Sequence, residues 1–215
     1  MADAPGLMEP AEEIAYETRC AEGAIWTGTR LLIGVIAMAF AGVGFAYFYL
    51  RSVNSEGLWR PHGQTAPLLL GTEIAGAALV GAILQSYGLF RLRRGLDLDW
   101  SVATWATAGA GVLGCGLQIW ELTRLGFQPG QSGYASLFVA WGPLSAALLL
   151  VGAYWSETLA ARALRMKSAV AGDGGLSASQ LPRARLFRAS AEGAAYFWWF
   201  ITTVSVLFWL LFYIV

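Results

Sequence analysis

The sequence predicts an all-α membrane protein built as a bundle of five transmembrane helices. Hydrophobic residues make up 57% of the 215 residues and charged residues only 13%, whereas soluble domains carry about 25% charged residues. Apolar runs of about 20 residues recur along the chain, and each can cross a hydrocarbon core about 30 Å thick. The runs are too long and continuous for the strands of a membrane barrel, which leaves helices as the structure that satisfies the backbone in lipid.

We expect these runs to be five spans, at about 31–50, 66–90, 101–123, 134–160 and 194–214. Residues 30–215 then form one transmembrane domain, preceded by an N-terminal segment, 1–29. Glutamate and arginine side chains interrupt that segment, so it lacks the apolar stretch of a cleavable signal peptide. Within it, Pro10 followed by Glu12 and Glu13 favours the start of a helix, which we expect to lie on the membrane surface.

The basic residues predict the orientation of the chain in the membrane. Eleven of the 14 lie in three stretches that fall on one side: residues 1–30 before the first span, the loop after the second span and the loop after the fourth. The opposite side keeps only Arg51, Arg60 and Arg124. Because positively charged segments stay in the cytoplasm, we expect the N-terminal segment to be cytoplasmic and the C-terminus to lie outside.

Side chains that could form a catalytic or metal site are scarce, and we expect no such site in this chain. The single histidine, His62, lies in a loop between spans and cannot form a haem or metal site alone. Cys20 and Cys115 lie far apart and outside any CxxC or CxxCH pattern. The stretch GAGVLG falls inside a predicted span, where its glycines favour close helix packing over nucleotide binding.

Glu73 is the acidic residue that the pattern places inside the membrane. Counted from Pro67, it lies six residues into the second span, which is about 9 Å at 1.5 Å per residue. An ionised carboxylate at mid-bilayer costs on the order of 3 kcal/mol, so we expect Glu73 to be either protonated or hydrogen-bonded, with polar groups of the third span as the expected partners. A structural interhelical bond and a proton-handling role both stay open, and the structural bond is favoured.

The other polar and aromatic residues have simpler interpretations. Gln118 and Glu121 share a helix face with small residues, and we expect this face to meet other protein. Glu121 also lies near the external end of its span, three residues before Arg124, so a solvated or paired interface charge explains it. Glu157 and Glu192 have the same interpretation at the cytoplasmic span ends. Five tryptophans near span ends are typical of the aromatic belt at a membrane surface: Trp26, Trp59, Trp100, Trp120 and Trp155.

Several stretches carry a family resemblance. The first span ends in FAGVGFAYFYLRS and is followed by LWRP, the third span continues as LGCGLQIWELTRLGFQPGQSGYASLF, and the last span reads YFWWFITTVSVLFWLLFY. These stretches resemble subunit III of the haem-copper cytochrome c oxidases, in its short five-span bacterial form and in a divergent version. The resemblance covers about residues 30–215. The residues that carry it are Arg51, Trp59, Gln118, Glu121, Trp198, Phe200 and Tyr213.

The chain departs from the family where the family keeps polar residues inside the bundle. A glutamate of the first span is replaced here at Ile36. Two histidines of the fourth span are replaced by Gly142 and Ser145. A histidine and an aspartate of the last span are replaced by Trp199 and Thr202. Glu73 lies one helix later than the family's glutamate, so the role of that glutamate does not transfer to it.

The resemblance implies a non-catalytic accessory subunit of a respiratory haem-copper terminal oxidase in the bacterial inner (plasma) membrane, with its C-terminus in the periplasm. Such a subunit packs against catalytic subunit I and other oxidase subunits, holds phospholipids, and supports assembly and sustained proton uptake and electron transfer. Haem and copper are then expected in the partner subunits and no cofactor in this chain. The enzyme would be a cytochrome c or quinol oxidase, and the balanced charge gives no sign of a nucleic-acid partner.

Two alternatives stay open. One is an accessory protein of a nitric oxide reductase. The other is a stand-alone small membrane transporter on the same fold, which should show paired helix interruptions or polar groups that converge near the midplane.

Overall fold

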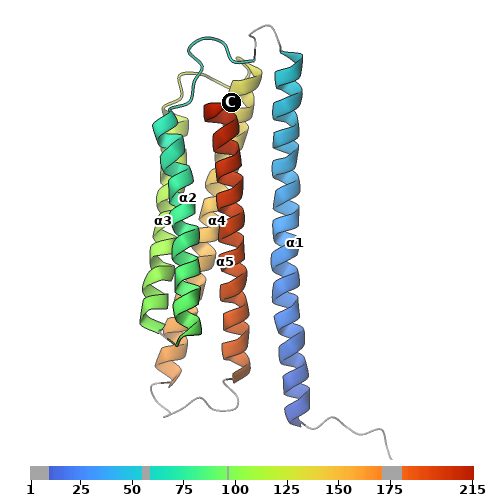
Figure 1. Ribbon diagram of the computed structural model, residues 1–215, viewed down its shortest axis with the longest axis vertical. Helices are drawn as coiled ribbons and strands as arrows, with labels where there is room; N and C mark the ends of the chain where they lie inside the picture. The colour runs from blue at the N-terminus through green and yellow to red at the C-terminus, as the bar shows by residue number, and fades with distance from the viewer. Residues whose placement is uncertain (1–9, 55–58, 96, 171–180) are drawn as a thin grey trace, which may run out of the picture.

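The computed structural model describes residues 10–54, 59–95, 97–170 and 181–215. The described residues form five long helices and no strand, each helix long and apolar enough to cross a membrane, so the expected five-helix membrane bundle is confirmed (Figure 1). The chain is therefore a multi-pass membrane protein. Its elements are α1 (Pro10–Val53), α2 (Leu68–Arg93), α3 (Asp97–Thr123), α4 (Gly133–Val170), α5 (Leu181–Trp209) and a terminal π-helical turn, η1 (Leu210–Ile214).

Helix α1 runs without a break through the boundary that the sequence suggests near residue 30. It has 44 residues, or about 66 Å at 1.5 Å per residue, which is more than twice the hydrocarbon thickness of about 30 Å. The expected helix start is confirmed, because α1 begins at Pro10 with Glu12 and Glu13 in its first turn. No proline occurs between Pro10 and Pro61, so nothing in the sequence ends the helix where the apolar run begins.

The helices pack in chain order, and α5 closes the bundle. Helix α2 lies against α3, α3 against α4, and α5 against α2, α1 and α4. The start of α1 and the end of α5 lie at opposite ends of the bundle (Figure 1), as an odd number of crossings requires. The turn between α2 and α3 is short because Gly95 adopts a positive φ of 74°, which a glycine reaches at no steric cost.

One tryptophan fills the centre of the four-helix group α2–α5. The indole of Trp198 is fully buried and donates a hydrogen bond from Nε1 to Ser156 Oγ at 2.9 Å. Gly81 of α2, Gly111 of α3 and Gly152 of α4 face its ring, and a methyl group added at any of them would lie 2.5–3.1 Å from ring carbons. Three helices therefore each leave out a side chain where this indole lies, and we call this arrangement the glycine socket.

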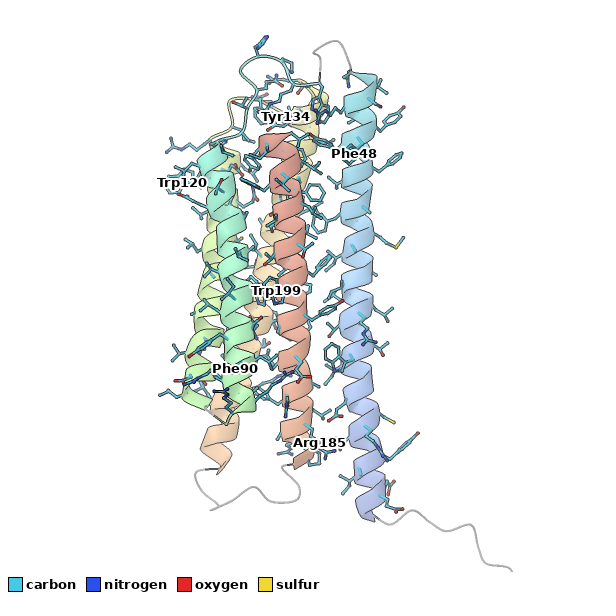
Figure 2. All side chains as sticks on the ribbon, in the orientation of Figure 1. Phe48, Phe90, Trp120, Tyr134, Arg185 and Trp199 are labelled. Atoms are coloured by element: carbon cyan, nitrogen blue, oxygen red, sulfur yellow. The ribbon has the colours of Figure 1, made fainter. Side chains whose placement is uncertain are left out.

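A cluster of aromatic side chains fills the end of the bundle where α5 finishes, around Tyr134 (Figure 2). Two tryptophans expected in the aromatic belt are buried instead, since Trp59 is 9% exposed and Trp100 only 1%. Trp120 is 55% exposed, as a belt residue should be. The belt interpretation is thus wrong for Trp59 and Trp100, because Trp59 packs against Tyr47 and Tyr134 and Trp100 packs against Phe187.

Ion pairs tie the helices together at the opposite end. Arg91 pairs with Asp99 across the α2–α3 turn. Glu192 of α5 accepts from Arg93 of α2 at 2.9 Å and lies 3.5 Å from Arg188 one turn earlier. The interpretation of Glu192 as an interface charge with arginine neighbours is confirmed. These pairs are partly exposed, so each adds only about 0–1 kcal/mol.

The glycine socket predicts that one methyl group on α2 is harmful at one position and harmless at another. Gly81→Ala should lower stability by about 1–3 kcal/mol, because its methyl group would press on the Trp198 ring. Gly76→Ala is the matched control, since a Cβ at Gly76 meets nothing within 4 Å. Thermal unfolding in mild detergent measures both, and equal midpoints for the two variants would contradict the socket.

Candidate functional site

A buried acid, an amide and a phenol form a polar site near the end of the bundle where α5 finishes. Glu121 of α3 is completely buried. Tyr213 donates from its hydroxyl group to Glu121 Oε1 at 2.6 Å, and Gln118 donates from Nε2 to Glu121 Oε2 at 2.8 Å. Each carboxyl oxygen thus accepts one hydrogen bond, which offsets much of the cost of removing the group from water.

Local structure explains why these three side chains meet. Gln118 and Glu121 lie three residues apart on α3, so they share one face of the helix. Tyr213 reaches them from η1, where the wider π-helical turn changes the direction in which α5 presents its last side chains. Gly71 of α2 makes room for the phenol ring, because any Cβ there would overlap it.

The polar site borders a small internal cavity. The cavity has a volume of about 10 Å³, and Gln118, Ser145, Ser205 and Tyr213 are among the residues that line it. This volume corresponds to roughly one water-sized probe. The space beside the polar site therefore holds little more than a water molecule.

Two tyrosines hold the backbone of η1 in place. Tyr47 of α1 donates to the carbonyl oxygen of Leu211 at 2.7 Å, and Tyr134 of α4 donates to that of Phe212 at 3.0 Å. The last carbonyl groups of a helix have no partner within the helix, so these hydroxyl groups supply what the backbone lacks. The position of Tyr213 is thus set by α1 and α4 as well as by α5.

Arg51 and Trp59, which the resemblance singles out, belong to the same support. Arg51 donates to the hydroxyl group of Tyr47 at 3.1 Å. The ring of Trp59 meets Tyr47 and Tyr134 edge-on, with centroids 5.0 and 6.1 Å apart. Arg51 and Trp59 therefore contact the two tyrosines that hold η1 and do not contact η1 through these interactions themselves.

The structure contradicts the expected hydrogen bond between Glu73 and the third span. Glu73 is exposed on the outer surface of α2, and no hydrogen bond or ion pair reaches its carboxyl group from the residues that the structure describes. Its neighbour Ile74 is 4% exposed and faces the core, as do Ala77 and Gly81. Successive residues turn by about 100° around a helix, so Glu73 lies beside the buried face and outside it. The expected bond to the third span is absent.

The interpretation of Glu121 as an interface charge paired with Arg124 is also wrong. Arg124 instead lies over the ring of Trp120, with its guanidinium carbon 5.8 Å from the ring centre. The expectation that Gln118 and Glu121 face other protein is confirmed, since they are 1% and 0% exposed. The signal that could have identified Glu121 is Gln118 itself, an amide donor three residues earlier on the same face.

The positions where the family keeps polar residues serve packing in this chain. Thr202 donates to the carbonyl oxygens of Ala78 at 2.9 Å and of Trp198 at 3.0 Å. Trp199 is 45% exposed and donates from Nε1 to Ser86 Oγ at 2.9 Å. Both residues thus attach α5 to α2.

The remaining replaced positions lie in apolar surroundings. Ile36 is partly buried against the main core. Gly142 is buried, and a Cβ there would come within 2.6 Å of Leu122, so close packing of α3 on α4 requires the glycine. Ser145 is 2% exposed and lines the small cavity. Phe200, a residue of the resemblance, is partly buried with its ring 6.3 Å from that of Phe197.

A second set of buried polar groups lies between α2 and α3, away from the Glu121 site. Gln85 and Thr104 are 0% exposed, and their side-chain oxygen and nitrogen atoms have no hydrogen-bond partner among the described residues. Trp100 Nε1 and Ser101 Oγ are in the same situation. Burial of such groups lowers stability, so this interface is the least well compensated part of the described core.

The described residues contain no group of three or more His, Cys, Asp or Glu side chains that could hold a metal ion. No protein-family model matches the chain, and no curated protein matches it either. Among the described residues, Glu121 is the one buried acidic side chain, and it is hydrogen-bonded to Gln118 and Tyr213.

Loss of one hydroxyl group should reveal how much Glu121 depends on Tyr213. Tyr213→Phe removes a donor from a buried acid, which should lower stability by about 1–3 kcal/mol. Tyr49→Phe is the control, because Tyr49 is 57% exposed. Thermal unfolding in detergent measures the difference. If Glu121→Gln were combined with Tyr213→Phe and the two losses simply added, the hydrogen bond would carry no coupling energy.

Proposed function

We propose that this chain is an accessory subunit of a respiratory haem-copper terminal oxidase, similar to subunit III of cytochrome c oxidases. Its role is to pack against catalytic subunit I and other oxidase subunits, hold phospholipids, and sustain proton uptake and electron transfer in the complex. Haem and copper belong to the partner subunits under this proposal. The polar site of the described residues is buried and hydrogen-bonded around Glu121, which suits a structural role.

The observation that carries the proposal is the convergence of the family-like motifs. Gln118 and Glu121 come from one motif and Tyr213 from another 92 residues later, and hydrogen bonds join all three. Arg51 and Trp59 come from a third motif and support the same end of the bundle. Five of the seven residues that carry the resemblance therefore lie in one connected cluster, whereas Trp198 and Phe200 pack elsewhere in the bundle.

The transporter alternative receives less support. A transporter should have broken helices that bring polar groups together near the midplane. In the described residues Pro143 is the one proline inside a helix, and Glu73 lies on the outer surface of α2.

The proposal includes an orientation in the bacterial inner membrane, with the start of α1 in the cytoplasm. The arginines of the α2–α3 turn and of the first part of α5 lie at the end of the bundle opposite the C-terminus, where Figure 2 labels Arg185. Positive charge of this kind stays in the cytoplasm.

Cysteine labelling tests this orientation. Cys20 is free and exposed on α1, so a membrane-impermeant maleimide should label it in inverted vesicles and leave it unlabelled in spheroplasts. His62→Cys should show the opposite pattern in a Cys20→Ser background, because His62 is exposed in the loop at the other end. Labelling of Cys20 in intact spheroplasts would reverse the proposed orientation.

Purification in mild detergent tests the function. A tagged chain should co-purify with a haem-containing membrane subunit, and the preparation should show a haem difference spectrum and consume oxygen with cytochrome c or quinol as electron donor. An unrelated multi-pass protein with the same tag is the control. A chain that purifies alone, without haem, refutes the proposal, and a haem-containing complex that reduces nitric oxide but not oxygen favours the nitric oxide reductase alternative.

A further inference from the structure

The small cavity beside the Glu121 site lies where several elements of the bundle meet. Residues of α2, α3, α4, α5 and η1 all line it. Its volume of about 10 Å³ is close to the smallest space that can hold a water molecule in a protein. A ligand of this cavity therefore has the size of a single water molecule.

Two buried serines line the cavity from different helices. Ser145 of α4 is 2% exposed and Ser205 of α5 is 5% exposed. No hydrogen bond from the residues that the structure describes reaches the hydroxyl group of either serine. Because a buried hydroxyl group without a partner raises the free energy of the folded state, both groups need a partner that this part of the chain does not supply.

Other buried hydroxyl groups of the bundle bond to a carbonyl oxygen one turn earlier on their own helix. Thr107 donates to the carbonyl oxygen of Ala103 at 2.8 Å, and Thr202 donates to that of Trp198 at 3.0 Å. Ser145 and Ser205 also lie inside helices, but their hydroxyl groups make no such bond within the described chain. Their hydrogen-bonding capacity is thus left for a ligand of the cavity that they line.

The amide group of Gln118 adds a third polar side chain to the wall of the cavity. Its Nε2 atom donates to Glu121 Oε2 at 2.8 Å, whereas no donor among the described residues reaches its Oε1 atom. A buried water molecule makes about three hydrogen bonds to polar groups that lack other partners. Two hydroxyl groups, which donate or accept, and one amide oxygen, which accepts, match a water molecule in number and in chemistry.

We propose that this cavity binds one water molecule, which bridges Ser145 of α4, Ser205 of α5 and Gln118 of α3. The water accepts a hydrogen bond from a serine hydroxyl group and donates one to Gln118 Oε1. Since Gln118 donates in turn to Glu121, the water connects α4 and α5 to the surroundings of the buried acid. The inference goes beyond the proposed function and does not depend on it, because the cavity and its polar groups all belong to this chain.

Radiolytic labelling of the full chain in its own membrane detects such a water directly. X-ray pulses convert water to hydroxyl radicals, which oxidise the side chains next to it. Trp141 lines the cavity and is 3% exposed, whereas Trp198 is 0% exposed and lies in the glycine socket. Trp141 should be oxidised at least about fivefold faster than Trp198, because a bound water lies beside its ring. Equal oxidation rates at the two tryptophans overturn the proposal.

A substitution that fills the cavity tests the role of the serines. Ser205→Val exchanges the hydroxyl group for methyl groups and should lower the oxidation rate of Trp141 to that of Trp198. Thr203→Val is the matched control two residues earlier on α5, where the exposed side chain bonds to the carbonyl oxygen of Trp199. This control should leave the oxidation of Trp141 unchanged. Rapid oxidation of Trp141 in Ser205→Val, or an equal decrease in both variants, contradicts the proposed site.

A double-mutant cycle shows whether one molecule joins the two serines. Ser145→Ala and Ser205→Ala should each lower the midpoint of thermal unfolding. The double variant should lose less than the sum of the two decreases, because both serines bind the same water. Thr203→Ala should show no coupling to Ser145→Ala. Decreases that simply add for Ser145→Ala and Ser205→Ala overturn the bridge between α4 and α5.

Discussion

The fit of Trp198 between three helices is the constraint on which the rest of the bundle depends. Helices in lipid gain little from burial of apolar surface against one another, so close packing supplies much of their association energy. Here α2, α3 and α4 each contribute a glycine at the same level, and one indole ring fills the space. Its N–H group is satisfied by Ser156, so the socket holds a large side chain at the centre without an unpaired polar atom. The spacing of α2, α3 and α4 around α5 at this level follows from this volume.

The Glu121 site uses the geometry that the socket establishes. With α5 held by Trp198 and Thr202 against α2, its last turn arrives beside α3, where Tyr213 meets Glu121. Tyr47 and Tyr134 then fix the η1 backbone from two other helices. All five helices and η1 thus contribute to holding the donors of a single carboxyl group in place. An arrangement with so many supports suits a fixed point of the structure better than a group that moves during turnover.

The number of membrane spans could be predicted from the sequence. Whether a single side chain points into the bundle or out to its surface could not. Long apolar runs determine how often the chain crosses the membrane. Hydropathy carries no information once a helix leaves the bilayer, which is why α1 begins about 20 residues before the expected span. Glu73 and Glu121 show why the site could not be predicted from the sequence. Apolar residues surround α2 on all sides, so the sequence does not reveal which side faces inward, and a rotation of about 100° separates Glu73 from the core. One donor of Glu121, Tyr213, comes from η1 at the far end of the sequence, and only the folded chain shows that pairing.

The separation of Glu121 from Tyr213 has a consequence for biosynthesis. The ribosome makes Tyr213 92 residues after Glu121, so α3 enters the membrane long before its acid has a phenol donor. During that interval Gln118, on the same helix, is the donor already in place. Membrane insertion of α3 therefore has to tolerate an acid with half its final hydrogen bonds, and docking of α5 completes the set. A nascent chain that stalls before the last helix would expose a partly compensated acid to lipid, a defect that a membrane protease or insertase could recognise without any contact to the finished fold.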